Sequence, residues 1–137
     1  MILSRALDAR SQTLYERVEA YRQVFPNLRL HAEGYPEPDN LKAIIKRGRV
    51  AFGMKGVGDG LDTEASRAIL EVLRKEDARP VWVTVWGRSL DLGQALWDLR
   101  KESAPGEVNR IISRLRVYDI AGQDDCGQWI CHNFPDV

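Results

Sequence analysis

The sequence predicts an α/β fold in which a mainly parallel sheet has helices on both faces. Short β-rich runs alternate with segments of helical periodicity along the chain, and strands separated by helices pair in parallel. The run 81–86 is apolar except for Thr84, as expected of a strand that is covered on both faces. A length of 137 residues is typical of one domain. We therefore expect a single domain over residues 1–137.

The N-terminal part of the chain predicts a helix and a short strand. Apolar residues recur at helical spacing, and they are Leu14, Val18 and Tyr21. This stripe predicts a helix over about residues 10–24 that ends at Phe25–Pro26. The run 28–32 is expected to form a short strand.

The middle of the chain predicts a second helix, a short strand and the start of a third helix, with loops before and after the first two. After the Pro-rich stretch 34–40, apolar residues at 41, 44 and 45 predict a second helix that ends at Gly48. The run 50–53 is expected to form another short strand. A glycine-rich loop over 53–63 then leads into a third helix.

The third helix is expected to start after Asp62 or Thr63, since either side chain can cap it. Its apolar face is Ala65, Ala68, Ile69, Val72 and Leu73. The run 81–86 then predicts the clearest strand of the sequence. It stops at Trp86–Gly87, and the next segment has helical periodicity.

The C-terminal part predicts helices, with one strand between them. Ser89 or Asp91 can cap a helix whose buried residues are Leu92, Ala95, Leu96 and Leu99. Pro105 marks the start of a further helix, with Val108, Ile111, Ile112 and Leu115 as its stripe. Residues 116–120 predict a strand, and a last helix follows the Asp124–Asp125 pair.

Charge and composition exclude several classes of partner. Twenty basic and 20 acidic residues give a formal net charge of zero, so we expect no nucleic-acid and no membrane partner. No apolar stretch approaches the roughly 20 residues that span a bilayer, and MILSRALDAR lacks a signal-peptide core. As written, the chain is expected to be cytoplasmic, although a longer parent could be secreted.

The cysteines and histidines give no catalytic or metal pattern. Cys126 and Cys131 are five residues apart, a spacing that fits neither a CxxC pair nor a zinc knuckle, so free thiols are expected. His31 and His132 stand alone, and we interpret both as exposed.

The Trp86–Gly87 turn is the candidate ligand site. Ligands of open parallel sheets bind beyond the carboxyl ends of the strands, where backbone groups and helix N-termini are exposed. On spacing alone, the same turn is better explained as a tight connection without a ligand. Several carboxylates are expected in comparable connections or at helix starts, and they are Asp59, Asp62, Asp91, Asp124 and Asp125. Calcium prefers such oxygen ligands, but each Asp could also be a cap or loop residue.

The chain resembles the nucleoside hydrolase-like domain of bacterial and fungal proteins described as cellulose-binding. The motifs that carry the resemblance are RPVWVTVWG, LGQALWDLR, LRVYDIAGQDDCGQWI and NFPDV, with GVGDGLDTEAS upstream. It extends from about residue 17 to 137. The resemblance implies a fold similar to inosine-uridine nucleoside hydrolases, which cleave N-ribosyl bonds with a calcium ion. It also implies that the backbone carbonyl of Trp86 is a metal ligand, and that Asp62, Asp91, Asp124 and Asp125 face a nucleoside or carbohydrate substrate.

The sequence departs from the family in ways that affect activity. Relatives begin with a strand and an Asp-rich loop of the DxDxxxDD kind, which this sequence lacks. Leu90 stands where an amide side chain is usual, and Gly122 stands where many relatives have an acidic residue. We therefore expect a domain truncated at its N-terminus and also at its C-terminus, and the catalytic residues remain unknown.

Two functions remain open. In the first, the chain is part of an N-glycosyl hydrolase and is inactive by itself. In the second, it is a non-catalytic module that binds carbohydrate or a protein. Three of the four tryptophans are expected in the core, the four being Trp82, Trp86, Trp97 and Trp129. A missing strand would leave an unpaired edge and apolar surface, so a homo-oligomer is expected.

Overall fold

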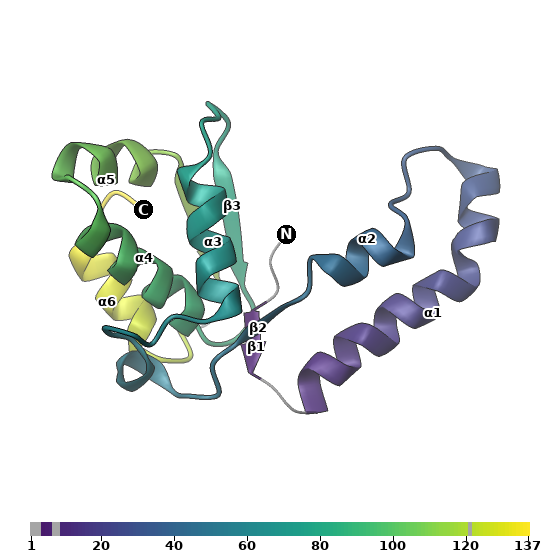
Figure 1. Ribbon diagram of the computed structural model, residues 1–137, viewed down its shortest axis with the longest axis horizontal. Coiled ribbons are helices and arrows are strands. Elements are labelled where there is room, and N and C mark those ends of the chain that lie inside the picture. Colours follow the sequence, from purple (N-terminus) through teal and green to yellow (C-terminus); the bar gives the residue numbers. More distant parts are fainter. Residues whose placement is uncertain (1–3, 7–8, 121) are drawn as a thin grey trace.

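The computed structural model describes residues 4–6, 9–120 and 122–137, with side chains from residue 12 onward. Figure 1 shows a body that contains helices α3 to α6 and strands β3 and β4, and an arm formed by α1 and α2 that projects away from it. Strands β1 and β2 lie where the arm meets the body. Within the described part, no helix is long and apolar enough to cross a membrane.

The arm begins with a helix that is longer than the sequence predicts. Helix α1 runs from Ala9 to His31 and contains Pro26, so the end expected at residue 25 and the strand expected at 28–32 are both wrong. Pro26 removes only one backbone donor, and the residues that follow are good helix formers, including Leu28, Arg29 and Leu30. The Tyr21 hydroxyl donates a 2.8 Å hydrogen bond to the carbonyl of Pro36, which turns the chain back along α1.

The second arm helix and the first strand pair follow. Helix α2 runs from Pro38 to Ala43 and starts with its proline in the first turn. Strand β1, Ser4–Ala6, pairs in parallel with β2, Lys46–Gly48. The prediction that the second helix ends at Gly48 is therefore wrong, and so is the strand expected at 50–53. There the chain makes a 3₁₀ turn, η1, from Gly53 to Gly56, because Gly53 adopts a φ of +65°.

The elements of the body agree with the sequence predictions. Helix α3 is Glu64–Arg74, β3 is Val81–Val85, α4 is Leu90–Glu102, α5 is Pro105–Ile112, β4 is Leu115–Asp119 and α6 is Asp125–Asn133. Of the two caps considered for α3, Thr63 is the one observed: its hydroxyl accepts from the Ser66 amide at 2.9 Å, and the Ser66 hydroxyl accepts from the Thr63 amide. Such a reciprocal box satisfies two donors that a helix start leaves free.

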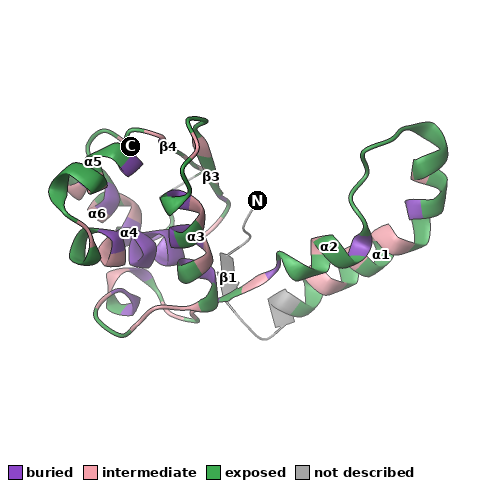
Figure 2. Cartoon of the chain, turned by 45° about the horizontal axis from the view of Figure 1, so that its top comes forward, coloured by how far each residue is buried: buried purple, intermediate pink, exposed green. Residues whose placement is uncertain are grey.

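The core lies between the helices of the body and one face of β3–β4. Its buried cluster comes from all four body helices and both strands, and it includes Leu73, Val85, Leu96, Leu99, Ile111, Leu115 and Ile130. Figure 2 shows the buried residues concentrated in the body, with α4 the most buried helix, whereas most of the arm is exposed or intermediate. Fully burying an aliphatic side chain of this kind contributes about 1.5–3 kcal/mol, so the body supplies most of the stability.

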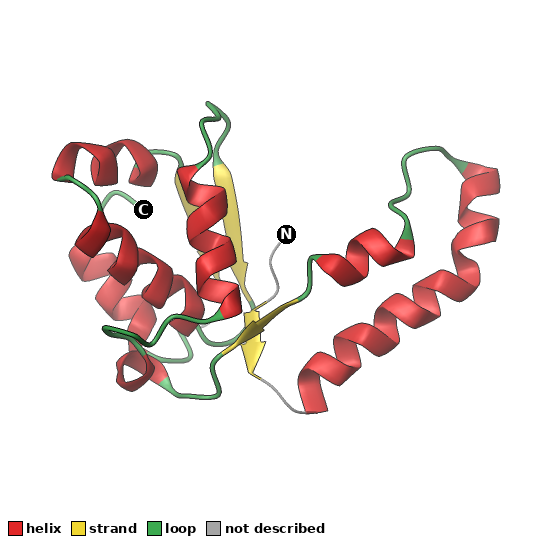
Figure 3. Cartoon of the chain, in the orientation of Figure 1, coloured by secondary structure: helices red, strands yellow, loops and turns green. Residues whose placement is uncertain are grey.

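The strands confirm an α/β fold with parallel pairing. Figure 3 shows the two strand pairs, β1–β2 and β3–β4, as separate small sheets. In β3–β4, Trp82 lies opposite Arg116 and Thr84 opposite Tyr118.

One expectation for the strand 81–86 is wrong in the described part of the chain. The strand has β4 as its one neighbour there, and it is not covered on both faces, because Trp82 and Trp86 are more than 60% exposed. The helices among the described residues cover the opposite face, where Val85 is buried.

Candidate functional site

The candidate site lies where strands β3 and β4 end. Because the two strands are parallel, the turn 86–89 and the start of α6 at Asp124 lie at the same edge of the sheet. Helices α4 and α6 begin there, and η1 packs against both of them. The turn that contains Trp86 and Gly87 therefore lies at the same edge as Asp124.

Asp124 joins the two connections. It is the N-cap of α6, where its Oδ1 accepts from the Cys126 amide at 3.2 Å and from the Ser89 hydroxyl at 3.0 Å. Its side chain is buried, and Oδ2 has no hydrogen-bond partner among the described residues. A buried polar atom without a partner is rare and costly, so Oδ2 is the atom of this edge best suited to take a donor from a ligand.

Asp91 lies in the first turn of α4 and is buried as well. Its Oδ1 accepts a 2.7 Å hydrogen bond from the Thr63 hydroxyl. A side chain on Gly48 would overlap the Asp91 carboxylate, so β2 approaches this carboxylate closely. Asp91 thus connects α4 to the cap of α3 and to the end of β2.

Asp125 is exposed at the start of α6, where its Oδ1 accepts from the Met54 amide at 2.7 Å. A side chain on Gly53 would overlap this carboxylate too. Asp125 therefore holds η1 against α6, and the glycine allows the close approach.

Asp59 and Asp62 lie in the loop that connects η1 to α3. Asp62 forms an ion pair with Arg67, and Asp59 accepts from the Trp97 indole at 3.2 Å and pairs with Lys101 at 2.6 Å. Hydrogen bonds from Lys101 and Trp97 lower the pKa of Asp59. Both carboxylates line a cavity of about 520 Å³ between α3 and α4, which contains neither Asp91 nor Trp86. The four predicted site carboxylates thus lie at one end of the body, but Asp62 faces a different space.

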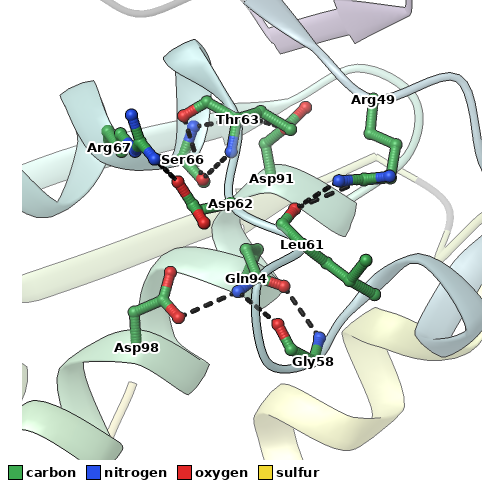
Figure 4. A network of polar contacts seen from close by, with 10 residues as sticks. All are labelled: Arg49, Gly58, Leu61, Asp62, Thr63, Ser66, Arg67, Asp91, Gln94 and Asp98. Carbon is green, nitrogen blue, oxygen red and sulfur yellow. Dashed lines mark hydrogen bonds and ion pairs between the residues drawn. The ribbon is translucent and has the colours of Figure 1, made fainter.

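Figure 4 shows a further contact that the sequence does not reveal. Gln94 is fully buried on α4; its Oε1 accepts from the Gly58 amide at 2.8 Å, and its Nε2 donates to the Gly58 carbonyl at 2.9 Å. The same amide group donates to Asp98 at 2.9 Å. A glutamine on the apolar face of a predicted helix was the available signal, because a buried amide needs partners.

The described residues do not fit the calcium site that the resemblance implies. Calcium takes six to eight oxygen ligands, whereas no group of three or more His, Cys, Asp or Glu side chains in the described part could hold a metal. The carboxylates of Asp91, Asp124 and Asp125 each accept hydrogen bonds from protein donors. Their arrangement is that of structural carboxylates.

The remaining predicted residues have mixed outcomes. Cys126 and Cys131 are free thiols, the first buried and the second exposed, and both histidines are exposed, as predicted. The prediction for the tryptophans is wrong. Trp97 and Trp129 are half-buried, with ring centroids 6.0 Å apart, whereas Trp82 and Trp86 are exposed, because the face of β3–β4 that carries them is open.

A solved structure is closely similar to this chain. It is described as a nucleoside hydrolase-related hypothetical protein from Saccharophagus degradans that is associated with carbohydrate metabolism. The similarity covers 98% of this chain, with 37% sequence identity and a TM-score of 0.89. The chain spans about a third of that relative's length, 34%. A comparison with curated proteins gave no match.

The family model gives the same result over almost the whole sequence. Residues 3–137 match the model described as cellulose-binding Sde182, nucleoside hydrolase-like domain. The match begins before residue 17, where the resemblance seen in the sequence starts, and thus includes the first part of the arm. The chain belongs to this nucleoside hydrolase-like family.

Proposed function

We propose that this chain is a ligand-binding part of a nucleoside hydrolase-like domain and does not hydrolyse the ligand by itself. The ligand is a hydroxyl-rich small molecule, either the ribosyl group of a nucleoside or a carbohydrate. Membership of a family described as cellulose-binding supports this ligand class, as does a relative associated with carbohydrate metabolism.

The unpartnered, buried Oδ2 of Asp124 carries this proposal. Oδ2 is fully enclosed in this structure, so a ligand hydroxyl near the Trp86–Gly87 turn would supply the missing donor only after the connection that ends at Asp124 shifts. The gain is large because an unsatisfied buried acceptor costs about 1–3 kcal/mol. Ser89 fixes the other carboxylate oxygen at 3.0 Å, so the acceptor is already oriented. Asp91 and Asp125 serve mainly to position the segments around it, whereas Asp62 lines the separate cavity between α3 and α4.

Binding can be tested by NMR titration with ribose, inosine and cellobiose. We expect shifts of the backbone amides around Gly87, Ser89 and Gly122. Asp124→Asn retains the acceptor for Ser89 and replaces Oδ2 by a donor, so it should weaken binding at least tenfold. The control Asp136→Asn changes the same charge at an exposed position and should bind as the wild type does. Equal binding by both variants would contradict the proposal.

Calcium binding and hydrolysis are separate parts of the proposal. We expect calcium to bind weakly, with the Trp86 carbonyl as one ligand, because the nearby carboxylates already accept protein donors. Since general-base catalysis typically contributes ~10²–10⁴-fold and no base is positioned at this edge by the described residues, inosine, uridine and nitrophenyl riboside should not be turned over. Calcium-dependent turnover that Asp62→Ala or Asp91→Ala abolishes would refute this expectation.

We also propose that the chain self-associates as a homo-oligomer. The open, aromatic face of β3–β4 supports this, because contiguous exposed apolar surface mostly marks an interaction site. A cytoplasmic location stays a prediction.

A further inference from the structure

The cavity between α3 and α4 adjoins a second one beside α4. The first has a volume of about 520 Å³, and Asp59 and Asp62 are part of its wall. The second has a volume of about 260 Å³ and is lined by Asp59, Trp97, Arg100 and Lys101. Because Asp59 and Lys101 line both, the two cavities meet at this pair of residues. We call the two together the α3–α4 cleft.

The wall of the α3–α4 cleft carries paired charges. Among its described residues five are acidic and four are basic, which leaves a net charge of minus one. The ion pairs of the wall are Arg67 with Asp62, Arg74 with Glu102 at 2.8 Å, and Lys101 with Asp59 at 2.6 Å. Paired side chains offer hydrogen-bond donors and acceptors without a strong field of one sign. Such a wall suits a neutral ligand with many hydroxyl groups.

An aromatic ring and fixed polar groups lie together at one end of the cleft. The Trp97 indole donates to Asp59 Oδ1 at 3.2 Å, and Lys101 pairs with the same oxygen. The residue before it, Gly58, is held at its amide and its carbonyl by buried Gln94, as Figure 4 shows. Asp59 is therefore held through both its side chain and its backbone, so little conformational entropy is lost when a ligand binds there.

We propose that the α3–α4 cleft is a second binding site of this chain, and that its ligand is a neutral carbohydrate chain. The inference takes the ligand class from the proposed function, on which it rests, but uses none of the residues around Asp124. A sugar ring has apolar C–H faces and a rim of hydroxyls, so its site needs an aromatic surface beside polar groups. Trp97 supplies the first, and Asp59, Lys101 and Arg100 supply the second.

The dimensions of the cleft agree with more than one sugar unit. Small-molecule sites usually enclose about 300–1,000 Å³, and the cavity between α3 and α4 alone has about 520 Å³. It extends from the loop at Asp59 and Asp62 to the ion pair of Arg74 and Glu102 near the other ends of both helices. A chain bound at Trp97 can thus continue between the helices.

Other occupants fit the cleft less well. A metal ion needs several close ligands, and no group of three or more His, Cys, Asp or Glu side chains in the described part could hold one. Further protein would have to cover charges at the rim, where the side chains of Arg67 and Asp59 are 75% and 66% exposed. Burying ion pairs costs more solvation than their attraction usually returns, so the cleft suits a hydrated ligand, unlike the apolar open face of β3–β4.

The test follows the indole N–H signals by NMR while cellohexaose is added. The chain has four tryptophans, and the signals missing from Trp97→Phe, Trp82→Phe and Trp86→Phe identify three of them. We expect the Trp97 signal to shift and those of Trp82 and Trp86 to stay unchanged. A response of Trp82 or Trp86 without one of Trp97 would place the sugar on β3 and overturn the inference.

Two variants test the polar groups of the cleft. Asp59→Ala and Lys101→Met should each weaken cellohexaose binding roughly tenfold or more, as expected when a hydrogen bond to a charged group is lost. The control Lys42→Met removes the same charge from an exposed position on α2 and should bind as the wild type does. Dispersed amide spectra check that every variant is folded. Equal binding by all three variants would overturn the cleft as the site.

The remaining outcomes separate this inference from the proposal on which it rests. The amides around Gly87 report on the Asp124 site, and the Trp97 indole reports on the cleft. Asp124→Asn should leave the Trp97 shift unchanged, because Asp124 does not line the cleft. Amide shifts without a Trp97 shift overturn only the inference, whereas no response to any of the sugars overturns both. Tighter binding of the polyamine spermidine than of cellohexaose, lost in Asp59→Ala, would overturn the neutral ligand class.

Discussion

The Thr63 hydroxyl lies between two helix starts: it accepts from the Ser66 amide at 2.9 Å and donates to the Asp91 carboxylate at 2.7 Å. One side chain thus caps α3 and satisfies a buried acid of α4. The two helices are joined at their N-terminal ends by this hydroxyl, as Figure 4 shows.

Thr63→Val should therefore lose more stability than an ordinary cap variant. Loss of the cap costs about 0.5–2 kcal/mol, and loss of a donor to a buried carboxylate costs a further 1–3 kcal/mol or so. Urea unfolding should show a decrease of about 2–4 kcal/mol in the free energy of unfolding. Thr63→Ser, which keeps the hydroxyl, should lose under about 1 kcal/mol. Equal losses in the two variants would mean that the methyl group, not the hydroxyl, matters here.

Gly48→Ala should be destabilising because its new methyl group would overlap the Asp91 carboxylate. We expect a loss of about 1–3 kcal/mol, the usual cost of inserting a methyl into a packed site. Gly106→Ala is the matched control: it lies in the first turn of α5 with no neighbouring atom within 4 Å of the added carbon. It should be neutral or stabilising by up to about 1 kcal/mol. A harmless Gly48→Ala would show that β2 can move away from α4.

Asp98→Asn should stabilise the chain at neutral pH. Burial raises the pKa of the Asp98 carboxyl, Glu102 and Asp62 raise it further, and the hydrogen bond from Gln94 opposes the shift. An acid whose pKa is higher in the folded state binds its proton more tightly there, so its contribution to stability falls as pH rises through that pKa.

The asparagine can still accept from Gln94 and carries no charge at any pH. The difference in free energy of unfolding between variant and wild type should thus be largest near neutral pH and disappear in acid, where Asp98 is protonated. Chemical denaturation at several pH values measures it, with Asp136→Asn as the exposed control. A difference that grows as the pH falls would refute the sign of the shift.

The two thiols should differ strongly in reactivity. Burial raises the pKa of the Cys126 thiol to about 12, and Asp124, Asp125 and Asp91 add to the effect, whereas Cys131 is exposed on the same helix. Because the thiolate is the nucleophile, Ellman's reagent should titrate one thiol in the native chain and two after unfolding. Native Cys131→Ser should be unreactive; rapid labelling of this variant would mean that α6 opens readily.

The body could be predicted from the sequence because each of its helices has one apolar stripe and all the stripes face one core. The Thr63 cap of α3 also agreed, since it is a local interaction, whereas Ser89 stands at the N-cap position of α4 without a side-chain cap hydrogen bond. In the arm no large core fixes where α1 ends, and the helix continues past Pro26, at which the sequence pattern predicts an end. A proline does not end a helix where the residues on both sides of it favour the helical conformation.

The candidate site was predicted in outline only. Strand ends and helix starts place Asp91 and Asp124 at one edge, because connectivity alone determines that edge. Their partners, such as Thr63 for Asp91 and Ser89 for Asp124, come from segments 28 and 35 residues away. The apolar run 81–86 gave the strand, but an apolar run does not tell which chain covers its second face.

The arm is expected to unfold locally while the body remains folded. The main core cluster comes entirely from residues 69 onward, whereas the described side chains before β2 contribute only Phe25, Pro38 and Ile45 to the buried set. Helix α1, about 35 Å long at 1.5 Å per residue, contacts mainly α2 and β1. Cooperative units with few buried contacts open at lower free energy than the whole chain. In native-state hydrogen exchange, the amides of α1 and α2 should therefore exchange by sub-global opening, while those of α4 exchange only through global unfolding.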